Sequence, residues 1–237
     1  MILVPTTPAP AAVPVDESLA TLAHELRDPL ATVLLALEMI PEGDPAARQA
    51  RTIAEHQTRR VVRIVDDLFD LCAGCRDKLP LREEVVDLAE VVAGATETTA
   101  HLLAARGHRL TVALPPRPVS LLADRLRLEQ VLTNLLANAA KFTDPGGDIR
   151  LTARAEAGQA VMRVRDNGRG IAPEVLPRVF DPFWQGPENN GARGLGLGLA
   201  LVKSLVELHG GSVTAFSDGP GTGCEFVVRL PVCARAA

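Results

Sequence analysis

The stretch RLRLEQVLTNLLANAAKFT, residues 125–143, combines a helical pattern of apolar residues with one row of polar side chains. Gln130, Asn134, Asn138 and Lys141 follow one another at intervals of four, four and three residues, which places them on one face of a helix. Nearly all the residues between them are apolar, so the rest of the helix belongs in a core. A polar row that is buried without partners is costly. The row therefore faces either bulk water or a polar ligand.

The chemistry of this row suits a metal ion and phosphates. Asn134 and Asn138 offer amide oxygens one turn apart, and such oxygens are ligands that Mg²⁺ accepts. Lys141 adds a positive charge where phosphates would lie. We therefore expect a magnesium and phosphate site on this helix, with a solvated helix face as the alternative.

A second polar signal ends the predicted strand in VMRVRDNGRG, residues 161–170. Alternation places Asp166 on the same side as the apolar residues at positions 160, 162 and 164, so a carboxylate ends a row that faces the core. Such a carboxylate needs a donor, and the exocyclic amine of adenine is a suitable one. Gly168 and Gly170 let a flat base approach the backbone. The alternative is an Asp-Asn-Gly turn on the surface.

A third signal is RGLGLGLALVKSLVELHGG, residues 193–211, in which Gly194, Gly196 and Gly198 lead into a helix predicted over residues 195–209. The free N–H groups at a helix N-terminus favour phosphates. The spacing matches neither a Walker A loop nor G-x-G-x-x-G.

The segment before these glycines, FDPFWQGPENNGA (residues 180–192), has the composition of a mobile lid. Phe180, Phe183 and Trp184 are predicted to anchor the base of this lid on the core.

The N-terminal third has a different pattern. Apolar residues recur in alternating steps of four and three over residues 19–40 and again over residues 50–75, and PEGDP (residues 41–45) separates the two runs. These patterns predict an antiparallel helical hairpin, and a two-fold dimer would complete a four-helix bundle.

The remainder of the chain mixes helical and strand patterns without regular βαβ alternation, which predicts an α+β sandwich with helices on one face of a sheet. We therefore divide the chain into a flexible tail (residues 1–15), a helical hairpin domain (residues 16–76), a linker (residues 77–84) and an α+β domain (residues 85–232).

Composition narrows the classes of function. The chain has 237 residues and a net charge of −4, which argues against nucleic-acid binding and against binding to an anionic membrane. No run approaches the roughly 20 apolar residues that span a bilayer, and the first residues lack a signal peptide pattern, so we expect a soluble, cytoplasmic protein. Cys72 and Cys75 have no partner pair with zinc spacing. They are interpreted as small apolar residues on a helix, with a redox or dimer-linking role as the alternative.

Taken together, six segments resemble the motifs of bacterial two-component sensor histidine kinases, in family order and over roughly residues 15–231. They are HELRDPL (residues 24–30), NLLANAAKF (134–142), DNGRG (166–170), FDPF (180–183), GLGLGLALVKSL (194–205) and GTGCEF (221–226). The resemblance implies a dimeric helical hairpin joined to an ATP-binding α/β sandwich of the Bergerat or GHKL type. It also implies a histidine kinase that uses ATP and Mg²⁺ and passes the phosphoryl group to an aspartate in a response regulator receiver domain.

The resemblance assigns roles to individual residues. His24 would be the phosphoacceptor and Glu25 would accept its proton, while Asn138 would hold Mg²⁺ with Asn134 and Lys141 close by. Asp166 would read the adenine amine. Further residues placed around the nucleotide are Phe142, Gly168, Gly170, Ile171, Phe180, Phe183, Gly194, Gly196, Gly198 and Thr222.

The residues around His24 fit such a role. His24 lies just off the apolar stripe of its helix, and an ordinary imidazole, with a pKa of about 6.5, is largely neutral and nucleophilic near pH 7. Pro29 cannot donate the helical hydrogen bond that the carbonyl of Glu25 would accept, which predicts a kink. We interpret this kink as a soft spot that lets the helices shift between kinase and phosphotransfer arrangements.

Two residues depart from the family pattern. Asp28 stands where the family usually has Thr or Asn, which argues against phosphatase activity, and Gln185 stands where an arginine is common. No sensor or receiver domain is visible in the sequence, so the input signal is unknown.

Two other functions remain to be weighed. One is a different ATPase with the same nucleotide fold, such as a chaperone, a topoisomerase or an anti-sigma kinase. The other is a catalytically silent scaffold. The motif HELRDPL on a dimerising hairpin disfavours the first, and the intact set of site residues disfavours the second.

Overall fold

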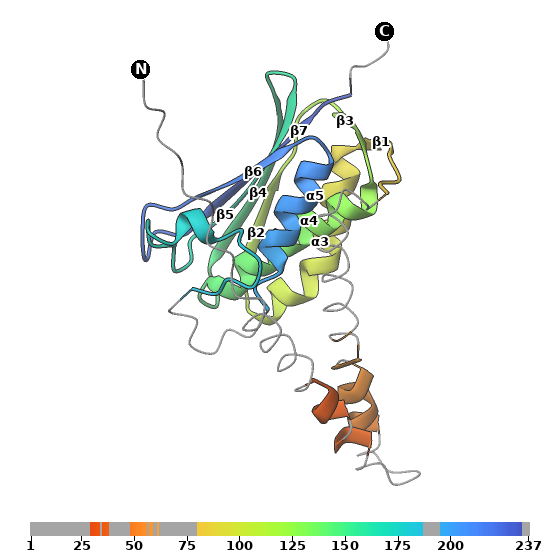
Figure 1. Ribbon diagram of the computed structural model, residues 1–237, viewed down its shortest axis with the longest axis vertical. Coiled ribbons are helices and arrows are strands. Elements are labelled where there is room, and N and C mark those ends of the chain that lie inside the picture. Colours follow the sequence, from red (N-terminus) through yellow and green to blue (C-terminus); the bar gives the residue numbers. More distant parts are fainter. Residues whose placement is uncertain are drawn as a thin grey trace, which may run out of the picture. The chain divides into compact units, whose positions relative to one another are not determined.

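The computed structural model describes residues 29–33, 35–37, 48–55, 57–58, 61, 80–186 and 195–233. The chain divides into two compact units, Met1–Val65 and Asp66–Ala237 (Figure 1). The predicted residues His24, Glu25, Asp28, Cys72, Cys75 and Gly194 lie outside the described residues.

The first unit contributes helical residues between positions 29 and 37 and between positions 48 and 61. Ala36, Ala50 and Ala54 form its buried cluster, and Val33 packs against them. Small side chains at these positions let the two helical segments approach closely. Leu30 and Leu37, which the periodicity predicted to be in the seam, are 48% and 51% exposed in the single chain.

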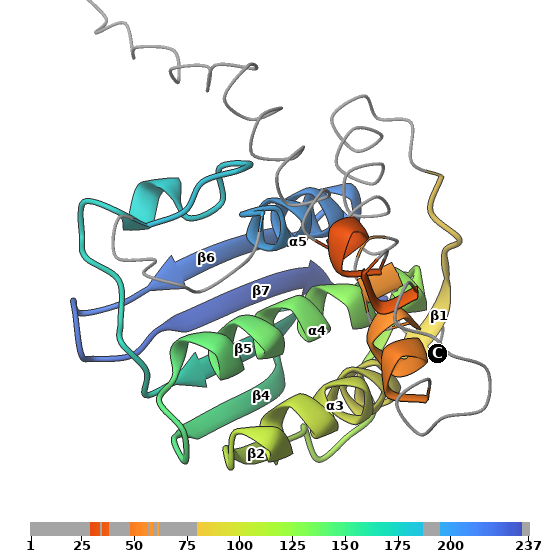
Figure 2. The same ribbon diagram turned by 90° about the horizontal axis from the view of Figure 1, so that it is seen from below.

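The second unit is built on a five-stranded mixed sheet in the order β2-β4-β5-β7-β6. Strand β2 runs parallel to β4, and the other neighbouring pairs are antiparallel. Figure 2 shows the three long helices on one side of this sheet. The strands are β2 (Arg109–Ala113), β4 (Asp148–Glu156), β5 (Gln159–Asp166), β6 (Ser212–Phe216) and β7 (Glu225–Pro231), and the helices are α3 (Leu88–Ala105), α4 (Arg125–Phe142) and α5 (Gly198–Leu208). This arrangement confirms the predicted α+β sandwich.

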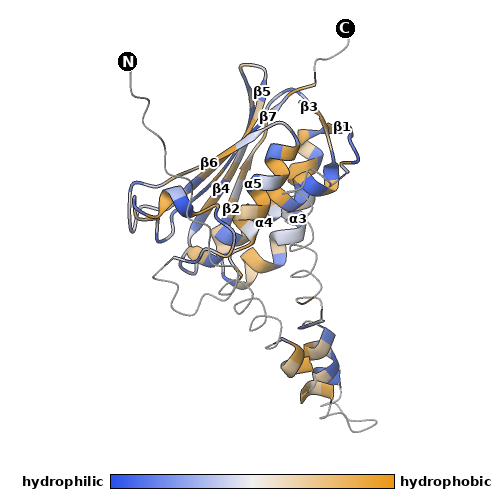
Figure 3. Ribbon diagram, viewed as in Figure 1, coloured by the Kyte–Doolittle hydropathy of each residue, from blue (hydrophilic) through white to orange (hydrophobic). Residues whose placement is uncertain are grey.

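The core lies between the sheet and the helices. Along β5, Ala160, Met162, Val164 and Asp166 are all buried, as the alternation predicted. They pair with inward residues of β4 and β7 and face the buried leucines of α4. Figure 3 shows the resulting mixture of apolar and polar residues along the three helices.

The start of α4 is fixed by Asp124. Its Oδ1 accepts a hydrogen bond of 3.2 Å from the backbone N–H of Arg127, which caps the helix. Its own N–H donates to Nε2 of the buried His209 at 3.0 Å, and its Oδ2 accepts from the N–H of Arg82 at 3.1 Å. These contacts fix where the helix that carries the polar row begins.

Two differences from the predicted elements affect the second unit. Residues 84–87 form strand β1 (Glu84–Asp87), which the sequence did not predict; it pairs with β3 (Ser120–Ala123). The helix predicted from residue 195 begins at Gly198, because Gly196 adopts a left-handed φ of 71° that a helix cannot contain. Among the described residues, no helix has both the length and the apolar character needed to cross a bilayer.

Candidate active site

Asp166 ends β5 in a position that leaves half of its carboxylate open. The residue is 6% exposed, and its Oδ1 accepts hydrogen bonds from the N–H groups of Gly168 at 2.9 Å and Cys224 at 3.3 Å. Burial raises the pKa of Asp166, while these two N–H groups act to lower it. Within the described part of the chain, no donor reaches Oδ2. A buried carboxylate with one open oxygen is an acceptor suited to an amine from a ligand.

Three glycines are required around Asp166 because backbone approaches backbone there. A Cβ on Gly168 would overlap the carbonyl oxygen of Phe142, and one on Gly223 would overlap the carbonyl of Asp166. A Cβ on Gly170 would overlap the carbonyl oxygen of Gly219. Gly170 and Gly223 also have left-handed φ angles of 70° and 76°. The surroundings of the carboxylate are therefore built from tightly packed main chain.

Hydrogen bonds join the loop after β5 to the loop between β6 and β7. The N–H of Ile171 donates to Oγ of Ser217 at 2.9 Å, and that hydroxyl donates to the carbonyl of Gly223 at 2.8 Å. The predicted ligand residue Thr222 is exposed and donates its hydroxyl to the carbonyl of Gly219 at 2.7 Å, within its own loop.

The polar row of α4 meets the start of α5. Asn134 Nδ2 is buried, and in the part of the chain that the structure describes no acceptor bonds to it. The nearest atom to a Cβ on Gly198, the first residue of α5, would be Cγ of Asn134 at 4.0 Å. No side chain caps the N-terminus of α5. An unpaired amide donor and an uncapped helix N-terminus therefore lie side by side, which is an arrangement that favours an anion.

The end of α4 approaches the Asp166 loop through Phe142. The ring of Phe142 lies 4.7 Å from Nζ of Lys141 and 4.2 Å from the guanidinium carbon of Arg169. The N–H of Arg169 also donates to the carbonyl of Phe142 at 3.1 Å. Lys141 and Phe142 are thus brought to the same edge of the sheet as Asp166.

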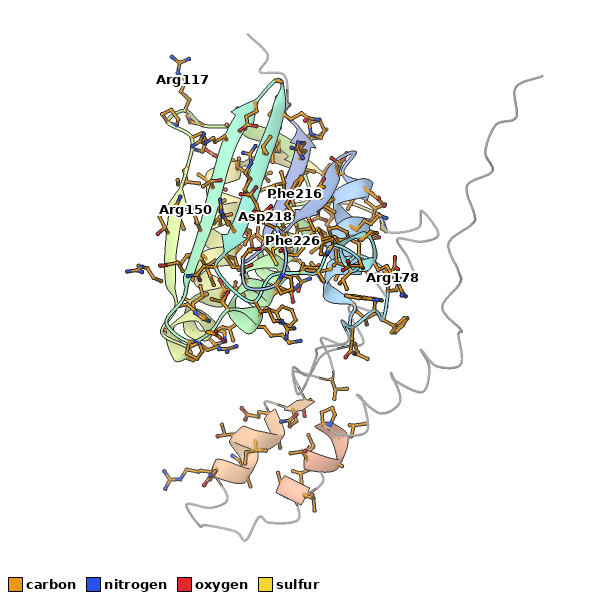
Figure 4. The ribbon with its side chains drawn as sticks, turned by 90° about the vertical axis from the view of Figure 1, so that its left-hand side faces the viewer. Arg117, Arg150, Arg178, Phe216, Asp218 and Phe226 are labelled. Carbon is orange, nitrogen blue, oxygen red and sulfur yellow. The ribbon has the colours of Figure 1, made fainter. Side chains whose placement is uncertain are left out.

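The segment predicted to anchor a lid contacts the core. Phe180 packs edge-on against Phe226 of β7, with ring centroids 6.2 Å apart. Phe183 has a left-handed φ of 61°, and its N–H donates to the carbonyl of Gly196 at 3.1 Å. Figure 4 labels Phe226 and Arg178. The guanidinium carbon of Arg178 lies 6.0 Å from the centroid of the Trp184 ring.

Sequence reasoning missed other residues near Asp166, chiefly Thr143, Ser217 and the contact from Cys224. Burial, with the charge of Asp166, raises the pKa of the Cys224 thiol to about 12. Cys224 lies 58 residues from Asp166 in the chain. Periodicity carries no signal for such a contact, which depends on the pairing of β5 with β7.

Two family models match this chain. Residues 15–71 match the His Kinase A (phospho-acceptor) domain, and residues 123–234 match the histidine kinase-, DNA gyrase B- and HSP90-like ATPase. This chain is a two-component histidine kinase catalytic core. The combination decides the family, because a phospho-acceptor domain precedes the ATPase domain in one chain.

Several sensor kinases are similar over nearly the whole chain. The sensor protein KdpD of Escherichia coli is 35% identical over 90% of this chain and 24% of its own length. The probable sensor histidine kinase TcrY of Mycobacterium tuberculosis is 36% identical over 92% of this chain and 46% of its own. The structure of full-length ShkA in complex with AMPPNP is 31% identical over 93% of this chain and 47% of its own, with a TM-score of 0.71. The chain thus spans less than half the length of these relatives.

Proposed function

We propose that this chain is an ATP-dependent protein histidine kinase that phosphorylates its own His24 and passes the phosphoryl group to an aspartate of a response regulator. One observation carries the nucleotide part of this proposal. An open carboxylate oxygen on Asp166 and an unpaired amide donor on Asn134 lie beside the same helix, α4. The first suits the amine of a base and the second suits an anion. From residue 134 to residue 143 the helix rises roughly 13 Å, which leaves room for a base at one end and phosphates at the other.

At the base, Asp166 accepts the exocyclic amine of adenine, and Gly168 and Gly170 let the main chain pack closely around its carboxylate. Phe142 and Ile171 border the same loop. Because Asp166 is held by two backbone N–H groups, its orientation is set before any nucleotide arrives.

At the phosphates, the N-terminus of α5, Asn134 and Lys141 supply the donors and the positive charge. Asn138 offers an amide oxygen one turn after Asn134 on α4, which fits a Mg²⁺ ligand. Among the described residues, no three His, Cys, Asp or Glu side chains form a metal cluster, so the ion would take most of its ligands from phosphates and water. When bound with the nucleotide, Mg²⁺ supplies charge neutralisation at the phosphates.

The acceptor side rests on the match of residues 15–71 to the phospho-acceptor model. The neutral ring of His24 would attack the γ-phosphorus, so an N–P bond forms as the bond to the ADP oxygen breaks. Glu25 would take the ring proton. This chemistry would use a histidine with a carboxylate beside it in the sequence.

The proposed assembly is a homodimer through the helical hairpin. Leu30 and Leu37 are 48% and 51% exposed in the single chain, although both belong to the predicted apolar seam, and the neighbouring helical segment exposes Ile53 by 39%. A second hairpin would cover them and complete the four-helix bundle. The receiver domain of a response regulator is then the expected partner of phosphorylated His24.

The test is incubation of the full chain with γ-labelled ATP and Mg²⁺, comparing the wild type with His24→Gln and with His101→Gln, an exposed histidine of α3. We expect acid-labile, alkali-stable label in the wild type and in His101→Gln, and none in His24→Gln. ATP turnover without labelled histidine would instead support another ATPase of this fold, and absence of nucleotide binding would support a silent scaffold.

A further inference from the structure

Thr143 carries a buried hydroxyl that the fold does not use. The residue is 2% exposed and ends α4, where its N–H donates to the carbonyl of Ala139 at 3.1 Å. Its Oγ1 is buried and has no hydrogen-bond partner among the described residues. An unpaired buried hydroxyl costs free energy, and valine would fill nearly the same volume without that cost. The hydroxyl therefore needs a purpose beyond packing.

The position of this hydroxyl relates it to Asp166. The point at which a Cβ of Gly168 would stand lies 2.8 Å from Thr143 Oγ1 and 2.9 Å from Asp166 Oδ1. The two oxygens thus flank the same small space, which stays open only because residue 168 is a glycine. A threonine hydroxyl rotates about one bond, and a hydroxyl donates readily to a carboxylate.

The surroundings of Asp166 explain why another donor is useful. Both of its hydrogen bonds reach Oδ1, and both come from backbone N–H groups. Burial opposes ionisation of this carboxyl and raises its pKa. A further donor would favour the ionised carboxylate, in which both oxygens can accept hydrogen bonds.

We propose that Thr143 is a positioning residue for Asp166. When adenine is bound, its hydroxyl donates to the Asp166 carboxylate, directly or through one ordered water, and holds it ionised and oriented toward the exocyclic amine. This inference rests on the proposed nucleotide site and adds a determinant of its base specificity. Thr143 does not touch the base; it acts through Asp166.

The experiment uses the full chain as wild type, Thr143→Val and Thr143→Ser. Binding is measured for ATP and for purine riboside triphosphate, which lacks the exocyclic amine. We expect Thr143→Val to weaken ATP binding by about tenfold, since a hydrogen bond to a charged group is lost, and to change binding of the analogue by less than twofold. Thr143→Ser keeps the hydroxyl and is expected to bind ATP like the wild type. Thermal unfolding of unliganded Thr143→Val is expected at or above the wild-type temperature.

The pH dependence separates positioning from packing. Loss of a donor raises the pKa of Asp166, so on acidification the ATP affinity of Thr143→Val should fall at a higher pH than that of the wild type. A purely structural role would instead lower the unfolding temperature and weaken both nucleotides alike. That result, or unchanged ATP binding in Thr143→Val, would overturn the inference. If the wild type binds neither nucleotide, the proposed function itself fails.

Discussion

The two ends of the candidate nucleotide site are built in opposite ways. At the base end, formed by Asp166, Gly168, Gly170 and Gly223, backbone groups bond to one another and to the Asp166 carboxylate. At the phosphate end, formed by Asn134, Asn138 and the first turn of α5, the described residues give the Asn134 donor no hydrogen-bond partner and the helix N-terminus no side-chain cap. At the base end the main chain is already hydrogen-bonded, whereas at the phosphate end the donors are left for a ligand.

This difference predicts which substitutions affect the stability of the fold and which affect only ligand binding. Glycine substitutions at the base end should disturb the fold, because main chain packs against main chain there. Substitutions at the phosphate end should leave the fold intact or improve it, because they remove groups with unmet hydrogen bonds. Phe183, next to the phosphate end, has a left-handed φ, and backbone strain of this kind clusters at functional sites.

Two glycine substitutions, one at each end, should differ most in their effect on the free energy of unfolding. Gly223→Ala would place a Cβ on the carbonyl of Asp166 at a left-handed φ, so we expect a loss of about 3 kcal/mol or more in the free energy of unfolding. Gly198→Ala meets no atom closer than 4.0 Å, so its free energy of unfolding should be unchanged or greater by up to about 1 kcal/mol. Urea unfolding of both variants checks this, and equal losses would contradict it.

Asp166→Asn should affect binding more than folding. It keeps the shape of the side chain but replaces an acceptor oxygen with a donor, so we expect ATP affinity to fall by about 100-fold, as measured by calorimetry. Because burial raises the pKa of Asp166, the folded protein holds this proton to a higher pH than the unfolded chain does. The contribution of Asp166 to the free energy of unfolding is fully present below the ordinary carboxyl pKa. It is lost as the pH rises through the raised pKa of the folded state.

The unliganded variant should therefore be more stable than the wild type at neutral pH, and this advantage should disappear below the ordinary carboxyl pKa. Chemical unfolding from pH 3 to pH 8 measures the difference. An advantage that stays constant over this range would show that ionisation of Asp166 costs nothing in the folded state.

Asn134→Leu tests whether the phosphate end exchanges stability for ATP affinity. It removes the buried unpaired donor, so we expect the free energy of unfolding to rise by about 1 kcal/mol while ATP affinity falls by about tenfold. Gln130→Leu is the matched control, because Gln130 lies one turn earlier on α4 and accepts from Arg127 at 3.0 Å. Should both leucine variants bind ATP like the wild type, Asn134 would have no part in the site.

Ala157→Asn gives the smallest expected effect and lies away from both ends. Ala157 has a left-handed φ of 47° in the turn between β4 and β5, and asparagine tolerates that conformation better than alanine. We expect a gain of about 0.5 kcal/mol in the free energy of unfolding and no change in ATP affinity. A change in affinity would mean that overall stability, rather than local structure, controls binding.

Periodicity was sufficient to predict the long helix α4 and the hairpin strands. The bounds of α4, β4 and β5 follow from apolar spacing, and so does the inward row of β5 that ends at Asp166. Local patterns were insufficient where distant segments meet. The start of α5 at Gly198 depends on the Gly196 turn packing against Phe183 and Trp184, and the role of Thr143 becomes visible only when Gly168 lies against it. His24 and Glu25 remain predictions supported by the family match.

The measurement that tests the account most directly is amide hydrogen exchange of the full chain with and without the non-hydrolysable analogue AMPPNP and Mg²⁺. We predict slow exchange at the N–H groups of Asp166 and Gly168 in both states, because the fold already bonds them. New protection should concentrate at the start of α5 and at residues 183–186. Equal gains at both ends, or no gain at the start of α5, would contradict a site whose base end is preformed and whose phosphate end is completed by the nucleotide.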